Sequence, residues 1–220
     1  ARILGSMKAP SGVVTIDGFY DGVQLDDETR AILAAVPDDE AEILRSVGLI
    51  RADAVAATLQ EAIQYPSLNI RGLSAAWTGA ASRTVIPPEA VAELDVRLVM
   101  ESDPERLIGL VKQHIEGLGF TVLGHAPTDA ERLKYARIVS MMSDISYGAF
   151  RSDPNSAPAL LARAGMKHLY GDEPILIRTM GGSIPIAPII AALGVPAATV
   201  PTVNIDNNQH SPNENLRVGN

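Results

Sequence analysis

The segment AELDVRL at residues 92–98 alternates strictly between apolar and charged side chains. A strand places successive side chains on opposite faces, so this alternation predicts a strand that is buried on one face only. Half-buried strands are typical of antiparallel sheets. We therefore expect an antiparallel sheet whose exposed face carries Glu93, Asp95 and Arg97.

The segments on either side of this strand indicate a sheet covered by helices. Residues 67–71 alternate in the same way, and Asp103-Pro104 caps an amphipathic helix that closes at Gly119. The other expected elements are strands at 13–16 and 120–123, and helices at 28–35, from 37 onward and at 52–63. The pattern predicts an α+β domain, with helices on an antiparallel sheet.

The sequence beyond about residue 150 follows a different pattern. Expected helices at 157–170 and 185–193 alternate with short, wholly apolar strands at 175–177 and 197–200. Strands of that kind belong to parallel sheets covered on both faces, and two of them cannot form such a sheet alone. We therefore expect residues 1–148 to be one domain and residues 149–220 an incomplete α/β portion of another, with its remaining strands upstream of Ala1.

Composition excludes several classes of function. The chain has 220 residues and a net charge of −8, and its 18 Lys and Arg residues are scattered, which argues against nucleic acid as a partner. The longest apolar stretch, residues 184–203, is interrupted by four prolines, so we expect no membrane span. The absence of cysteine excludes disulfides and thiolate chemistry. No signal peptide is visible, so we expect a cytoplasmic protein, although the start at Ala1 suggests a truncated N-terminus.

Two polar motifs near the C-terminus are candidate site elements. Gly181-Gly182-Ser183 joins an expected strand to an expected helix, where free backbone N–H groups favour an anionic ligand group. The alternative is a tight turn with Ser183 as a helix N-cap. His210 follows a polar loop and is either a metal ligand or a solvated histidine. A catalytic metal needs three or more protein ligands, so His210 alone cannot hold one.

Arg97 and the segment 82–87 are further candidates. Arg97 either pairs with a neighbouring carboxylate on its strand or clamps a substrate carboxylate with its planar guanidinium. Residues 82–87, which include Thr84, read as an edge strand that ends at Pro87. The remaining histidines are expected to be structural or exposed: His114, His125 and His168.

Five sequence blocks in order resemble the dinuclear zinc metallopeptidases of the carnosine dipeptidase type. The blocks are GFYD at 18–21, YPSLNIRGL at 65–73, RTVIP at 83–87 with RLV at 97–99, GGSIP at 181–185 and HSPNE at 210–214. The resemblance covers nearly the whole chain. It implies that residues 1–148 form most of a lid, or dimerisation, domain and that residues 149–220 form the C-terminal part of a catalytic domain.

The resemblance also implies roles for single residues. His210 is then a ligand of one of two Zn²⁺ ions, with Mn²⁺ as an alternative metal, and the substrate-binding residues are Thr84, Arg97, Gly182 and Ser183. The implied reaction is hydrolysis of a dipeptide or related amide by metal-activated water, in a homodimer formed through the lid. N-acyl amino acid deacylation, carboxypeptidase activity and a non-catalytic dimerisation module are the alternatives.

This sequence also departs from the family pattern. The other metal ligands, the general base and the oxyanion-stabilising histidine of that family have no counterpart here, so we assign no catalytic residue and expect the chain alone to be inactive. Met180 stands where close relatives have a glutamate, which puts amino-terminal substrate recognition by that side chain in doubt.

Overall fold

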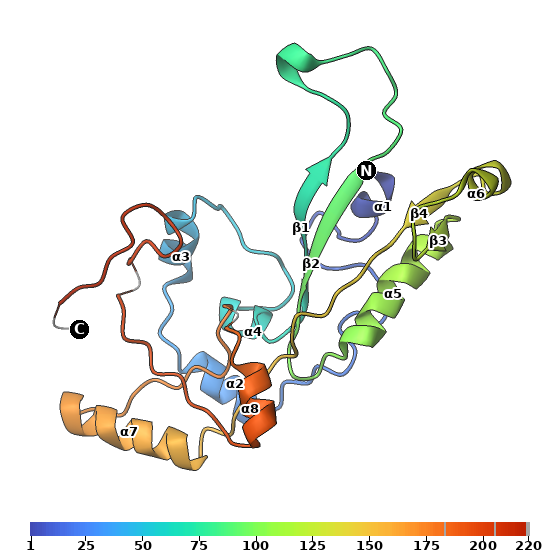
Figure 1. Cartoon of the computed structure of the whole chain (residues 1–220). Coiled ribbons are helices and arrows are strands. Elements are labelled where there is room, and N and C mark those ends of the chain that lie inside the picture. Colours follow the sequence, from blue (N-terminus) through green and yellow to red (C-terminus); the bar gives the residue numbers. More distant parts are fainter. Residues whose placement is uncertain (183, 205, 219–220) are drawn as a thin grey trace. The chain divides into compact units, whose positions relative to one another are not determined.

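The computed structural model describes residues 1–182, 184–204 and 206–218. The chain divides into two units, Ala1–Arg151 with Leu176–Pro188, and Ser152–Ile175 with Ile189–Asn220. Figure 1 labels the elements, which are α1 (Arg2–Gly5), α2 (Asp27–Ala34), α3 (Glu40–Ser46), α4 (Leu59–Ala62), β1 (Ser67–Ser74), the 3₁₀ turn η1 (Gly79–Ala81), β2 (Val91–Arg97), α5 (Pro104–Gly117), β3 (Thr121–Leu123), α6 (Asp129–Lys134), β4 (Ile138–Ser140), α7 (Ala157–Tyr170) and α8 (Ala187–Leu193). In the part of the chain described, no helix is both long and apolar enough to cross a membrane.

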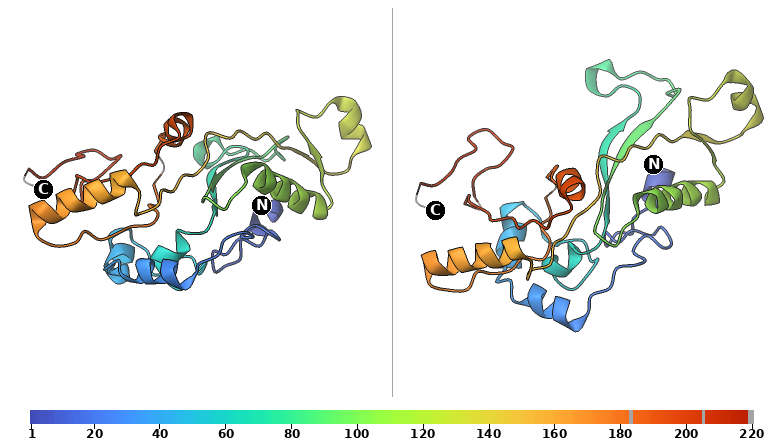
Figure 2. Two further views of the ribbon diagram at one scale, coloured as in Figure 1. Left: turned by 90° about the horizontal axis from the view of Figure 1, so that it is seen from below. Right: turned by 60° about the horizontal axis from the view of Figure 1, so that its bottom comes forward.

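The predicted antiparallel sheet is confirmed as the β1–β2 pair of the first unit. Ser67 lies opposite Arg97, and Asn69 lies opposite Asp95. Directly opposite residues share a face, so these four polar side chains lie on one side of the pair. We call this side the polar face. The long connection between β1 and β2 extends beyond the ends of both strands (Figures 1 and 2).

The other side of the pair contributes to the core of this unit. Leu68 of β1 is buried with Leu107, Val111 and Ile115, which recur every four residues along α5 and so share one helical face. The predicted cap is confirmed, because Asp103 Oδ1 accepts a hydrogen bond from the Arg106 backbone N–H at 2.6 Å. Figures 1 and 2 show α5 running beside the two strands.

The GFYD block at 18–21 packs into the same core. Phe19 is buried, and its ring meets the edge of Tyr20, which in turn meets Tyr65 at right angles. Arg106 of α5 donates to the carbonyl oxygen of Gly18 at 2.7 Å, and Gly18 has a φ of +75°. The block therefore joins the N-terminal segment to α5, which is a packing role.

Three predicted elements of the first unit were wrong in part. Residues 13–16 form only an isolated bridge, between Val14 and Lys8. Residues 120–123 supply β3, which pairs in parallel with β4 and forms a separate two-stranded sheet. The helix expected over 52–63 is reduced to α4, because the Ala54 N–H donates to Ser11 O at 2.8 Å and holds the preceding chain against the N-terminal segment.

The strands predicted at 175–177 and 197–200 do not form, whereas the predicted helices do, as α7 and α8. The difference has a physical cause. A helix satisfies its backbone hydrogen bonds within itself, but a strand needs a neighbouring strand, and the described residues provide none at either place.

Candidate functional site

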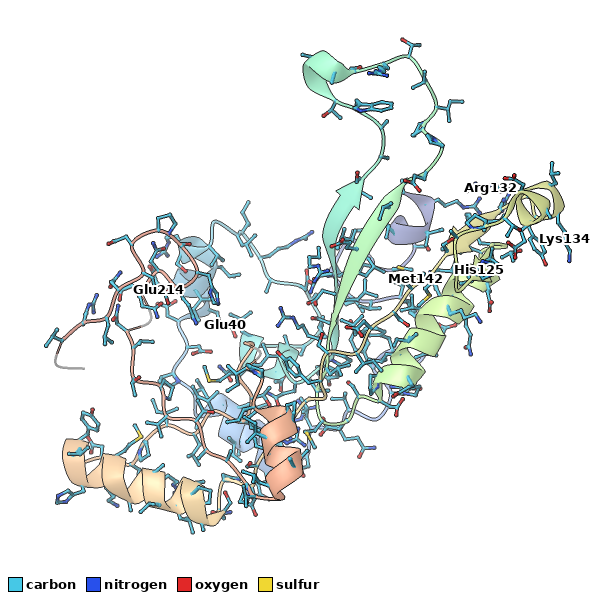
Figure 3. The ribbon with its side chains drawn as sticks, in the orientation of Figure 1. Glu40, His125, Arg132, Lys134, Met142 and Glu214 are labelled. Atoms are coloured by element: carbon cyan, nitrogen blue, oxygen red, sulfur yellow. The ribbon has the colours of Figure 1, made fainter. Side chains whose placement is uncertain are left out.

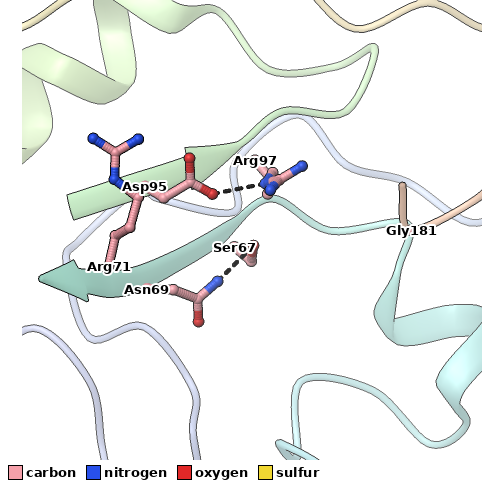
Figure 4. Close-up of a pocket in the computed structure, with 6 residues that line it drawn as sticks. All are labelled: Ser67, Asn69, Arg71, Asp95, Arg97 and Gly181. Carbon is pink, nitrogen blue, oxygen red and sulfur yellow. Dashed lines mark hydrogen bonds and ion pairs between the residues drawn. The ribbon is translucent and has the colours of Figure 1, made fainter. Parts of the chain in front are cut away.

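The polar face of the β1–β2 pair borders an open hollow of about 490 Å³. Its lining consists of Ser67, Asn69, Arg71, Asp95, Arg97 and Gly181, which Figure 4 draws as sticks. All six belong to the first unit. The hollow thus brings the charged strand of the sequence analysis together with the first glycine of the Gly-Gly-Ser turn.

Two guanidinium groups lie on the polar face, and a β2 carboxylate holds each of them. Arg97 Nε lies 2.7 Å from Asp95 Oδ2, and Arg71 Nη2 lies 3.1 Å from Glu93 Oε2. The Arg97 side chain remains about half exposed, at 52%. A guanidinium can hold a carboxylate through two parallel N–H···O bonds, so this face has the groups needed to bind a small anionic ligand.

Strand register explains why Arg71 reaches the hollow. The pairing is irregular between Ile70 and Gly72, where one extra β1 residue, Arg71, enters the ladder. A bulge of this kind changes the direction of a side chain and bends the strand locally. Gly72 then lies opposite Glu93, the partner of Arg71.

Gly181 forms the wall of the hollow next to the strands. A Cβ atom at Gly181 would lie 4.0 Å from the Cγ2 atom of Ile63, so the turn packs against the residue that ends α4. At Gly182 no atom of the described residues, its chain neighbours apart, comes within 4 Å of the corresponding position. Ser183, the third predicted residue of this turn, lies outside the described residues.

Two other predicted residues of the first unit, Gly182 and Thr84, are not among the lining residues of the hollow. Thr84 is exposed in the β1–β2 connection. His210 belongs to the second unit, where it is exposed in a turn with a φ of +62°. Over residues 1–182, 184–204 and 206–218, no three His, Cys, Asp or Glu side chains are grouped to hold a metal ion. The described part of the chain therefore does not form a complete metal site, and His210 is a single candidate ligand.

Sequence reasoning missed Ser67, Asn69 and Arg71 as lining residues. The signal was present, because these three residues alternate with Leu68 and Ile70 just as the charged residues of β2 alternate with apolar ones. When two such strands pair edge to edge with their apolar side chains on one face of the sheet, their polar side chains share the other face.

The other histidines have structural or exposed positions, as predicted. The Nε2 atom of His114 lies 2.9 Å from the Ser6 hydroxyl. His125 is exposed and lies 3.6 Å from Glu131 of α6, in the region where Figure 3 labels Arg132 and Lys134. His168 is exposed on α7.

A group of partly buried charges lies beyond the carboxyl end of β2. Arg151 pairs with Glu101 at 2.6 Å, and Arg178 lies 4.0 Å from the same carboxylate. Burial alone would raise the pKa of Glu101, but the hydrogen bond and charge of Arg151, with a contribution from Arg178, outweigh it and hold that pKa below its usual range. Glu101 therefore stays ionised at neutral pH and balances the two cations.

Comparison with known proteins agrees with this architecture. The family model of the M20 peptidase dimerisation domain matches residues 14–120, which contain the β1–β2 pair and α5. An M20 family metallo-carboxypeptidase from Sulfolobus solfataricus superimposes with a TM-score of 0.76 at 26% identity, over 98% of this chain and 46% of that one. A dipeptidase from Saccharomyces cerevisiae gives a TM-score of 0.72 at 26% identity, over 97% of this chain and 43% of that one.

Two curated relatives give the same result at the level of sequence. The Cys-Gly metallodipeptidase of Saccharomyces cerevisiae is 29% identical over 100% of this chain, and the mouse Beta-Ala-His dipeptidase is 26% identical over 97% of it. The fold and the matched domain thus define the class as a peptidase dimerisation domain with an attached C-terminal segment. The matched domain and the two relatives support the M20 dipeptidase family for this chain. It spans 44% and 42% of the lengths of those two relatives.

Proposed function

We propose that this chain is part of a metal-dependent peptidase that hydrolyses a dipeptide or a related amide bond. Residues 1–148 are then the lid, or dimerisation, domain, and residues 149–220 the C-terminal part of the catalytic domain. One observation carries the proposal. Arg97 and Gly181, the first glycine of the Gly-Gly turn, are far apart in the sequence and line the same hollow on the polar face.

Each residue of the hollow has a defined task in this proposal. Arg97, held by Asp95 and about half exposed, binds the free carboxylate of the substrate with its guanidinium group. Gly182 and Ser183, which follow Gly181 in the sequence, and Thr84 of the β1–β2 connection are proposed as further substrate-binding residues.

The metal requirement is supported by the metallodipeptidases among the relatives. We propose two Zn²⁺ ions, with Mn²⁺ as the alternative, and His210 as one ligand. The described residues contain no group of three potential metal ligands, so we expect the 220-residue chain by itself to be inactive.

An assay of the complete protein tests the function directly. The protein is incubated with a panel of dipeptides, with and without a chelator, and free amino acids are measured. Hydrolysis that the chelator abolishes and added Zn²⁺ restores is the expected result. Activity that survives exhaustive chelation, or no hydrolysis of any amide on the panel, contradicts the proposal.

Carboxypeptidase activity is the second candidate, and it is supported by the similarity to the Sulfolobus metallo-carboxypeptidase. Peptides of two to six residues separate the two. A dipeptidase loses activity beyond two residues, whereas a carboxypeptidase releases the C-terminal residue from the longer peptides as well. N-acyl amino acids in the same series test for deacylation.

We also propose that the complete protein is a homodimer formed through residues 14–120, the matched dimerisation domain. Sedimentation of the complete protein measures this directly. A dimer with no amidase activity on any substrate of the panel would favour the remaining alternative, a non-catalytic dimerisation module.

A further inference from the structure

Gln64 is a buried polar residue just after α4, and only 2% of it is exposed. Its side-chain Oε1 atom accepts hydrogen bonds from Arg178 Nη1 at 2.7 Å and from Thr179 Oγ1 at 3.0 Å. Its Nε2 atom donates to the backbone carbonyl of Gln60 at 3.1 Å. This one amide therefore connects α4 to the chain that leads into the Gly-Gly turn.

Such an arrangement is costly unless every polar group is paired. A buried amide loses its hydration, and it is tolerated where protein groups replace the lost hydrogen bonds. Here both acceptor bonds of Gln64 go to residues two and three positions before Gly181. The Arg178 side chain is only 16% exposed, and its charge is offset by Glu101, 4.0 Å away.

We propose that Gln64 is a positioning residue, which fixes the Gly181 wall of the hollow through Arg178 and Thr179 and thereby sets how tightly the substrate is held. Gln64 is not among the lining residues of the hollow. It acts by keeping the turn against the polar face. The inference rests on the proposed function for its effect on substrate, but the anchoring itself can be tested without any substrate.

Two substitutions in the complete protein separate anchoring from simple packing. Gln64→Met keeps the length of the side chain and removes the acceptor, whereas Gln64→Glu keeps an acceptor oxygen next to Arg178. Gln60→Met is the matched control on α4, because the Gln60 side chain donates to Asp38 and only its backbone carbonyl meets Gln64. We expect Gln64→Met to raise KM for a dipeptide about tenfold and to change kcat less than about threefold. Gln64→Glu and Gln60→Met are expected to stay within about threefold of the parent KM.

Native-state trypsin digestion tests the anchoring independently of activity. Trypsin cuts after Arg178 only when this segment opens, so the cutting rate reports the open population. Gln64→Met is expected to be cut there about tenfold faster than the parent protein, and Gln60→Met at the parental rate. Fragment masses identify the cleavage site.

The possible results separate this inference from the proposed function. Faster cutting at Arg178 in a protein that hydrolyses no dipeptide supports the anchor and rejects the function. If Gln64→Met leaves both KM and the rate of cutting after Arg178 unchanged, the anchor is overturned. It is also overturned if Gln64→Glu raises KM and the cutting rate as much as Gln64→Met does. If Gln64→Met does not fold, Thr179→Val removes one of the two donors with little change of shape. Thr179→Val is then expected to raise both KM and the rate of cutting after Arg178 about threefold. Parental values of both quantities reject the inference.

Discussion

Arg97 is the residue through which the polar face is expected to bind substrate. Replacing it with Ala removes a charge-assisted contact to the substrate carboxylate. For substrates with a free α-carboxylate, we expect kcat/KM of the complete protein to fall by a factor that corresponds to about 2–4 kcal/mol of lost transition-state stabilisation. Metal content should not change. Steady-state kinetics together with metal analysis of the same preparation measure both quantities.

Amidated substrates provide the control for Arg97. They carry no charge to bind, so Arg97→Ala and the parent protein are expected to hydrolyse them about equally. Equal losses on free and amidated substrates would mean that Arg97 is only the surface partner of Asp95, which it contacts at 2.7 Å.

His210 is expected to fail in a different way. If it ligates a metal, His210→Ala leaves the site short of one ligand and lowers the metal bound per protomer of the complete protein. His168→Ala, at another exposed histidine of the second unit, is the matched control. Metal content measured after dialysis shows whether His210 is a metal ligand or a solvated loop histidine. An unchanged metal content in His210→Ala supports the solvated loop histidine.

Glu101 links pH to the stability of the first unit. Its pKa is lowered in the folded protein, so its contribution is complete above the pKa of the unfolded state and is lost as pH falls through the folded value. Glu101→Gln leaves Arg151 and Arg178 without their shared anion. We expect it to cost about 1–3 kcal/mol in the free energy of unfolding at pH 7, and less below the folded pKa. Urea unfolding at several pH values measures this, and a difference that does not depend on pH contradicts it.

At the scale of the element, α5 holds the β1–β2 pair in place through one apolar face. Leu107 is 1% exposed, and Leu107→Ala leaves a cavity in the core that also contains Leu68 of β1. The expected cost is about 2–5 kcal/mol in the free energy of unfolding. Leu133→Ala on α6 makes the same change at a side chain that is 91% exposed, and it should cost less than about 0.5 kcal/mol. Denaturant unfolding of the two variants compares them, and similar costs would exclude α5 packing as the support of the sheet.

The whole chain is expected to be unevenly stable. The first unit has a defined core, whereas α7 of the second has no buried residue, and Leu161 and Leu169 are largely exposed on it. Residues 157–200 of the isolated chain should therefore exchange their amide hydrogens faster than residues 67–123. Hydrogen exchange with mass spectrometry measures both segments at once, and equal protection refutes the expectation.

Local periodicity and capping were enough to predict several parts of this protein. The alternation at 92–98 gave β2, and Asp103 with the four-residue apolar spacing gave α5. Helices α2 and α7 were also predictable, because a helix and its cap depend on residues a few positions apart. The family blocks pointed to Arg97 and the Gly-Gly turn, but not to their shared hollow.

Pairing between distant segments could be decided only by the tertiary structure. The partner of β3, the absence of strands at 175–177 and 197–200, and the extended chain before α4 all depend on which neighbours are available for hydrogen bonding. The site follows the same rule. Arg71 joins the hollow through a bulge in the ladder, and Arg178, three positions before Gly181, donates to Gln64 more than a hundred positions away in the sequence. A sequence pattern records which face a side chain occupies, but it does not record which distant segment that face will meet.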